Sequence, residues 1–290
     1  MARYSAVTLD LSRFPPPLAI RDVTYEGILA ARKNALQAAF DKYDIPYDVA
    51  MLETDPAIIL EEADAYRELL TLAAINDAVR AGLVAFAVGS DLDHLAAFYG
   101  VTRFENETND DFRRRVLLAP EAFAAAGPEG AYVYHALTAD PRVLNADVWS
   151  PASGKVAVAI QSREGDGAAS DELLTVVRSR LNRRDIKPLT DMVSVQSVEN
   201  VPYAIDVEAF ILPGPDEVMV RESVLASLTK MAADRRTPSR DMPLSAIHAA
   251  AMVGPVDKVI VKSPLVDLAR DRGEVALCTG INVKVTIYNG

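Results

Sequence analysis

Three histidines and a single cysteine are the side chains of this sequence best suited to metal binding or nucleophilic catalysis. One thiol excludes a disulfide within the chain and any metal site built from several thiolates. His135 and His248 occupy equivalent places in two similar stretches, which favours a structural role in which each imidazole bonds to a neighbouring carbonyl. We expect His94 to lie near a helix start and to take part in its cap, and Cys278 to be a small buried apolar residue.

The segment Gly165-Asp166-Gly167 lies between an expected strand and an expected helix, where a dinucleotide-binding fingerprint would begin. Ser170 stands where the third glycine of that fingerprint belongs, and the surrounding residues are acidic. These features favour a surface turn over a pyrophosphate cradle. A nucleotide-binding enzyme that uses the Gly165–Gly167 loop with one of the histidines remains the alternative.

Motifs of the common enzyme classes are missing from the sequence. It has no Walker A sequence, no G-x-S-x-G elbow, no H-E-x-x-H pair and no C-x-x-C. We therefore expect a protein that is not an enzyme, without catalytic, cofactor-binding or metal-binding residues.

The balance of charges argues against two classes of partner. The formal net charge is −11, whereas nucleic acids and anionic lipids recruit clustered lysine and arginine. The run Asp111–Val116, which contains three consecutive arginines, is expected to be a solvated helix face. Neither a signal peptide nor a membrane span is evident in the sequence, so we expect the chain to fold in the cytoplasm.

An extended arm and a helix are expected at the start of the chain. The run Phe14-Pro15-Pro16-Pro17 removes amide donors and favours polyproline II, so residues 1–22 are expected to form an arm that needs a partner. Thr24 suits the N-cap of a helix that ends near Tyr43.

One long amphipathic helix is the clearest signal in the sequence. Asp55 suits its N-cap, Pro56 its first position, and the pattern continues to about Val88. Roughly 30 residues at about 1.5 Å each span on the order of 45 Å, more than a compact domain of this size needs. Its apolar line is covered either by the Thr24 and Asn109 helices or by helices of other chains. In the second case the expected partner-interface residues are Ile59, Tyr66, Leu69, Leu72, Ile75, Val79, Leu83 and Phe86.

Two shorter helices are expected after the long one. The first is capped by Ser90 or Asp91 and stops at Gly100. The second has Thr108 as its N-cap and Asp111 as the acid of a capping box, so the acidic residues here serve the helix start and not a metal.

From about residue 120 the pattern changes to the alternation typical of strands, with helices between them. The stretches YVYHALTADPRVLNADVWSP and SAIHAAAMVGPVDKVIVKSP share a histidine, a proline-marked turn, a strand and a closing Ser-Pro. We infer two related α/β modules whose pieces follow one another in a different chain order, with strands paired mainly as antiparallel hairpins. Two like modules suit a scaffold.

The expected fold class is therefore α+β. We expect an elongated, multi-domain chain in which a helical region with one long helix precedes the two modules. The expected domains are an arm over residues 1–22, a helical core-bundle region over 23–119, and modules over 120–200 and 201–290.

Several collinear stretches carry a resemblance to a known family: LETDPAIILEEADAYRELLTLAAINDAVRAGLVAFAVGSDLDHLAAFYGV, DFRRRVLLAPEAFAAAGPEGAYVYHALTADPRV, REGDGAASDELLTVVRSRL, KPLTDMVSVQSVE and DMPLSAIHAA. In these the chain resembles the baseplate J-like wedge proteins of contractile phage tails and phage-tail-like bacteriocins. The resemblance covers most of the chain and departs over MARYSAVTLDLSRFPPPL at its start.

The resemblance implies a structural wedge subunit of the inner baseplate ring that helps transmit the trigger for sheath contraction. Its implied partners are a second copy of itself, a second baseplate wedge protein, a sheath initiator, neighbouring wedges and the central hub. The implied location is the tail baseplate of a virion or contractile particle, assembled in the bacterial host cytoplasm. A receptor-binding tail fibre is a third possibility, disfavoured because the first 120 residues look almost wholly helical and such proteins are rich in strands.

Overall fold

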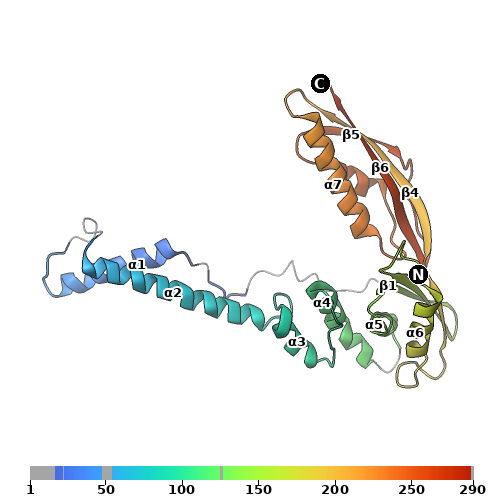
Figure 1. Ribbon diagram of the computed structural model, residues 1–290, viewed down its shortest axis with the longest axis horizontal. Helices are drawn as coiled ribbons and strands as arrows, with labels where there is room; N and C mark the ends of the chain where they lie inside the picture. Colours follow the sequence, from blue (N-terminus) through green and yellow to red (C-terminus); the bar gives the residue numbers. More distant parts are fainter. Residues whose placement is uncertain (1–16, 22, 48–53, 125–126, 289–290) are drawn as a thin grey trace. The chain divides into compact units, whose positions relative to one another are not determined.

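The fold was determined from a computed structural model that describes residues 17–21, 23–47, 54–124 and 127–288 (Figure 1). The described chain divides into two compact units, one reaching Leu117 and one starting at Leu118. The first is helical, and the second contains two small sheets with helices, so the expected α+β class is confirmed. Most of the expected arm, residues 1–16 and 22, lies outside the described residues. The four domain boundaries stay a prediction.

Two helices, α1 (Tyr25–Lys42) and α2 (Pro56–Ala81), pack against each other in the first unit. Their expected N-caps are formed, because Thr24 Oγ1 accepts from Gly27 N and Asp55 Oδ1 from Ala57 N. Helix α2 is 26 residues long and ends before Gly82, so its expected continuation to Val88 is wrong. Glycine ends helices readily.

The chain leaves the helical path after α2 because the side chain of Arg113 donates hydrogen bonds to carbonyls of this segment. Arg113 Nε donates to Val84 O at 2.7 Å and Arg113 Nη2 to Ala87 O at 2.8 Å. Carbonyls that accept hydrogen bonds from side chains do not need donors from a further helical turn. Leu83 and Phe86 of the expected interface therefore lie in turns beyond the helix.

Helices α3 (Gly89–Ala97) and α4 (Asn109–Leu118) complete this unit, and a 3₁₀ segment η3 (Ala119–Phe123) follows. Thr108 caps α4 as expected, since its Oγ1 accepts from Asp111 N at 3.2 Å. The expected cap of α3 is wrong: its N-cap is Val88, and the Gly89 amide donates instead to Asn109 Oδ1 at 3.1 Å. His94 lies in the last turn of α3 and is exposed, so it takes no part in the helix start.

The arginine run on α4 is not a solvated face. The Arg115 side chain is 4% exposed and binds Glu107, and the Arg113 side chain is 15% exposed. The Arg115 guanidinium also stacks 4.2 Å from the ring centroid of Phe104. These arginines hold the α3–α4 region together by contacts with the segments before α4.

The second unit contains two three-stranded sheets, with helices packed against each (Figure 1). The first sheet has the order β1-β2-β3 and the second β5-β4-β6. Elements of the first module are α5 (Glu129–Leu137), β1 (Val143–Ala152), β2 (Lys155–Ser162), α6 (Asp171–Leu181) and β3 (Met192–Ser197). Those of the second are β4 (Glu199–Ile211), α7 (Glu217–Arg235), α8 (Leu244–Ala251), β5 (Val256–Ser263) and β6 (Glu274–Ile287).

Each sheet is mixed, so the expectation of mainly antiparallel hairpins is wrong. The central strand pairs antiparallel with one neighbour, β2 with β1 and β4 with β5. It pairs parallel with the other, β2 with β3 and β4 with β6. Parallel neighbours need a crossover, and α6 supplies one between β2 and β3.

The helix contacts show that the modules are related with their pieces reordered. Helix α5 packs on β1, α6 on β3, and α5 on α6. In the second module α8 packs on β5, α7 on β6, and α7 on α8. The pair α5–β1 therefore corresponds to α8–β5 and the pair β2–α6 to β4–α7, with these halves exchanged along the chain.

Candidate partner-binding surface

Helices α1 and α2 are joined at one point by a cluster of charges. The Arg32 guanidinium of α1 binds Glu61 at 2.7 Å, Glu68 at 2.9 Å and Asp64 at 3.2 Å, all on α2. Partly exposed ion pairs of this kind stabilise a fold little individually, but one guanidinium shared by three carboxylates fixes the rotation of one helix against the other.

The chain before α1 is held against α2 by one side-chain amide. Asn76 Oδ1 accepts from Arg21 N at 3.1 Å, and Asn76 Nδ2 donates to Arg21 O at 2.9 Å. Asn76 is 9% exposed. A buried amide that satisfies both backbone groups of an extended residue ties the end of the arm to the helix.

The helix pair has a very small core of its own. Among the described residues of α1 and α2, the buried apolar side chains are Ile28, Ile58 and Ala65. A groove of about 410 Å³ runs between the helices, lined in part by Ala31, Ala35 and Leu72. Helices of 18 and 26 residues ordinarily bury a continuous apolar stripe. The described residues therefore leave much apolar surface of the pair uncovered.

The eight expected interface residues fall into two groups. Ile59, Tyr66, Ile75 and Phe86 are 41–56% exposed. Leu69, Leu72, Val79 and Leu83 are half-buried. Half of the expected set is thus available to a partner, and half is already partly covered within the unit.

Two further residues belong to the exposed group although the sequence pattern did not indicate them. Leu60 is 67% exposed and Leu70 is 52% exposed. At about 100° per residue, Ile59, Tyr66 and Leu70 share one side of α2, whereas Ile75 lies on another. We call Ile59, Tyr66 and Leu70 the outer face of α2.

The Gly165–Gly167 turn and the two residues after it use several of their amides in hydrogen bonds within the protein. A phosphate cradle needs several backbone N–H groups that point at the ligand. Here three consecutive amides are already bonded, those of Gly167, Ala168 and Ala169, to Glu164 O, Asp166 Oδ1 and Ser197 Oγ respectively. The geometry favours the surface turn over the nucleotide site.

The remaining candidate residues are not brought together. His135 lies on α5, and His248 is exposed on α8. Cys278 is half-buried against the core of the second module. Within the described residues, no three His, Cys, Asp or Glu side chains are grouped as a metal site, and no helix is long and apolar enough to cross a membrane.

His135 is held neutral by its surroundings. Its buried Nδ1 has no hydrogen-bond partner among the described residues, so this nitrogen does not make the bond to a neighbouring carbonyl that we expected of the imidazole. Burial, with a smaller contribution from the positive charge of Arg180, lowers the pKa of His135 to about 4. Protonating this imidazole in the folded protein is therefore unfavourable.

This depressed pKa predicts a loss of stability in mild acid. Below the ordinary histidine pKa the unfolded chain binds a proton that the folded chain refuses, so stability present above about pH 6.5 falls as the pH approaches 4. Because His135 is only half-buried and solvent screens part of the effect, we expect a loss of about 1 kcal/mol between about pH 7.5 and about pH 5. Urea unfolding of the wild type and of His135→Gln at both pH values measures it. An equal loss in His135→Gln would assign the effect to other groups.

Two regions of the chain match known protein families. Residues 53–110 match the Baseplate J-like N-terminal domain, and residues 124–197 match the Baseplate J-like central domain. Baseplate protein J of Escherichia phage P2 is 35% identical over 292 residues, which cover 95% of this chain and 97% of the relative. The outer face of α2 lies within the first match.

Proposed function

The chain belongs to the baseplate J-like family, and we propose that it is a wedge subunit of a contractile-tail baseplate. In this role it forms part of the inner ring around the hub and helps transmit the trigger for sheath contraction. Its role is structural and not enzymatic. It acts in the tail of a virion or contractile particle after assembly in the bacterial host cytoplasm.

The outer face of α2 is the observation that carries this proposal. Ile59, Tyr66 and Leu70 are each more than half exposed on one helix. Exposed apolar side chains grouped on one side of a helix mark a surface that another chain covers. We propose that a second copy and a second wedge protein cover it in a helical bundle, while the sheath initiator, the hub and neighbouring wedges contact other surfaces.

The trigger would pass through this subunit as rigid-body movement. The two modules have their own sheets, and the core of the second is built on β4. Units of this kind keep their internal packing when an interface between subunits rearranges. When the ring spreads, each module would then rotate as a rigid body while the α2 bundle stays in place.

The test of the bundle is a pair of aspartates on the outer face. We expect Tyr66→Asp with Leu70→Asp to leave the chain folded, because both side chains are exposed, and to abolish co-assembly with the second wedge protein. Co-purification of the two wedge proteins measures assembly, and circular dichroism measures folding.

The matched control places two aspartates elsewhere on the same helix. Thr71 and Ala78 are exposed and lie away from the outer face, so Thr71→Asp with Ala78→Asp adds the same charge without touching the apolar group. This control should assemble. Normal assembly of Tyr66→Asp with Leu70→Asp would show that α2 is not the bundle contact.

A further inference from the structure

A groove with an excess of positive charge lies where the last turns of α7 meet α8. The two helices pack against each other. The groove has a volume of about 300 Å³, at the lower end of the range for sites that bind ligands. Three cationic side chains and a single carboxylate are among its lining residues, which are Ser227, Lys230, Met231, Asp234, Arg235, Arg240 and Ala250. We call this the α7–α8 groove.

The two arginines of the groove bind backbone carbonyls and not carboxylates. Arg240 Nη1 donates to Asp234 O at 2.8 Å, and Arg235 Nη1 donates to Asp241 O at 3.2 Å. Cations at the end of a helix also suit its dipole, which gives both arginines a structural role. A guanidinium has several N–H donors, however, so each arginine keeps donors for a further acceptor.

The charge of the groove is not neutralised by its neighbours. In the described part of the chain, neither arginine nor Lys230 forms an ion pair, whereas Arg115 binds Glu107 at 2.6 Å. Shielding of Arg240 from solvent, with a smaller contribution from the positive charge of Arg235, lowers the pKa of Arg240. Its guanidinium stays charged at neutral pH and would be stabilised by an added anion. The net charge of the whole chain is −11, so this local excess of cations runs against the composition.

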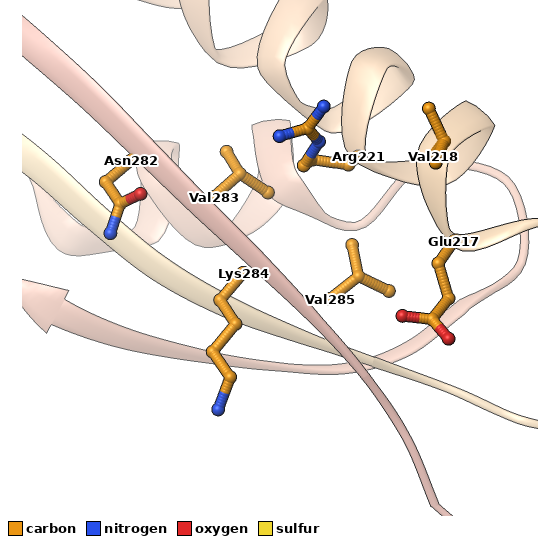
Figure 2. A pocket seen from close by; sticks show the side chains of 7 residues that line it. All are labelled: Glu217, Val218, Arg221, Asn282, Val283, Lys284 and Val285. Carbon is orange, nitrogen blue, oxygen red and sulfur yellow. The ribbon is translucent and has the colours of Figure 1, made fainter.

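A second groove beside α7, at its first turns, lacks this excess. Figure 2 shows its lining, in which Glu217 accompanies Arg221 and Lys284. Lys284 binds Glu208 at 2.8 Å. Glu217 and Arg221 are one helical turn apart, a spacing at which opposite charges attract. The cations of this second groove therefore have carboxylates of their own.

The α7–α8 groove suits a carboxylate better than a phosphate. Guanidinium groups bind carboxylates through paired N–H donors. Phosphates bind at helix N-termini, where backbone N–H groups point at the ligand, whereas this groove lies at the carbonyl end of α7. The apolar side chains of Met231 and Ala250 in its lining suit the methylene groups of a glutamate.

The symmetry of protein contacts favours a different protein over a second copy as the partner. A two-fold contact sets a surface against itself. Two copies of a groove with an excess of positive charge would repel each other across such an axis.

We propose that the α7–α8 groove binds a glutamate-rich segment of another protein, with Lys230, Arg235 and Arg240 paired to its carboxylates. The inference rests on the proposed function, in which this chain assembles with several different proteins. It uses residues in the other unit of the chain from the outer face of α2.

Titration with an acidic peptide tests the groove directly. The probe is tetraglutamate with blocked ends, and tetraglutamine is its uncharged match. NMR of the full chain, labelled on its methionine methyl groups, follows each titration. We expect the Met231 signal to shift to saturation with tetraglutamate and to stay in place with tetraglutamine, because Met231 lines the groove. The signal of Met219, 67% exposed and outside the lining, should not move.

A charge reversal in the groove should weaken this binding. Lys230 is exposed, so Lys230→Glu should leave the chain folded and weaken tetraglutamate binding about tenfold, since a repulsion replaces an attraction. Arg221→Glu is the matched control. It changes the charge equally on the same helix, but at about 100° per residue Arg221 lies on the opposite side from Lys230. The control should bind like the wild type.

Three results would overturn the groove as a site for an acidic segment. They are an unmoved Met231 signal, equal weakening by Lys230→Glu and Arg221→Glu, and an equal or larger shift with inorganic phosphate, which would assign the groove to free anions. Tyr66→Asp with Leu70→Asp should bind tetraglutamate normally. Failure of the groove therefore leaves the α2 bundle standing, and normal assembly of that outer-face variant would overturn the bundle alone.

Discussion

The Glu107→Ala variant is expected to lower the free energy of unfolding of the first unit by about 3–5 kcal/mol. Glu107 accepts from Arg115 Nε at 2.7 Å, from Arg115 Nη2 at 2.6 Å and from Phe104 N at 3.0 Å. The Arg115 and Glu107 side chains are 4% and 8% exposed. Alanine leaves the guanidinium buried without its counter-charge. Because whole domains are stable by only about 5–15 kcal/mol, this loss brings the unit close to unfolding.

Chemical denaturation of the full chain measures the loss, and hydrogen exchange of the α3 and α4 amides locates it. The matched control is Asp110→Ala, because Asp110 pairs with Arg113 at 2.7 Å but its side chain is 95% exposed. We expect the control to cost less than about 0.5 kcal/mol. Replacing both partners, with Glu107→Leu and Arg115→Met, should cost less than Glu107→Ala alone, since neither charge then remains buried. Equal losses in Glu107→Ala and Asp110→Ala would contradict this account.

The sequence predicted helix starts well where the signal was local. Thr24, Asp55 and Thr108 all accept hydrogen bonds from the first turn of their helices. A cap depends on residues two or three positions apart, so the signal for it is contained in a short stretch of sequence. The arginines of α4 were misplaced because Arg113 binds carbonyls 26 and 29 residues before it. The residues next to the three arginines in sequence give no indication of those partners.

The outer face of α2 was only half predicted for a different reason. Apolar residues lie on several sides of this helix, so a set of apolar residues spaced by three or four positions does not stay on one side. The predicted interface includes both Leu69 and Tyr66, although Leu69 is half-buried and Tyr66 is 56% exposed. Which side meets α1 is decided by the Arg32 cluster and by Asn76, and both depend on contacts that are distant in sequence.

The reordered modules were visible in the sequence, but their sheets were not. The shared histidine and Ser-Pro spacing marked α5–β1 and α8–β5 as equivalent, and the helix contacts agree. Parallel pairing of β2 with β3 was missed although a usable signal was present. A helix between two strands is the connection that parallel neighbours need, whereas a hairpin needs only a short turn.

The two modules meet at a buried carboxylate that no sequence pattern indicated. Asp147 of β1 is 9% exposed. Its Oδ1 accepts from Arg272 Nη1 at 2.8 Å, and its Oδ2 accepts from Gly273 N at 2.9 Å and from Ser239 Oγ. A single residue, Val198, separates β3 from β4. The connection is therefore so short that contacts across the junction set how the modules lie against each other.

Asp147→Ala is expected to lower the free energy of unfolding of the second unit by about 3 kcal/mol. The Gly273 amide and the Ser239 hydroxyl lose a buried acceptor, whereas the 23% exposed Arg272 side chain can reach water. The probe is Trp149, the one tryptophan of the sequence. A Cβ on Gly273 would lie 3.3 Å from its ring, so Trp149 emission reports on this junction. Urea unfolding followed by that emission should show a lower midpoint and a red-shifted native spectrum.

Two variants separate the junction from a general effect of lost charge. Glu172→Ala removes a carboxylate that binds Arg142 at 3.1 Å but is 76% exposed, and it should cost less than about 0.5 kcal/mol without shifting the emission. Asp147→Asn keeps the size of the side chain and one acceptor oxygen, so it should fall between the other two. If Asp147→Ala matched Glu172→Ala in both midpoint and emission, the carboxylate would not hold the modules together. If the predicted order is found, movement of one module relative to the other requires this buried carboxylate to exchange its partners.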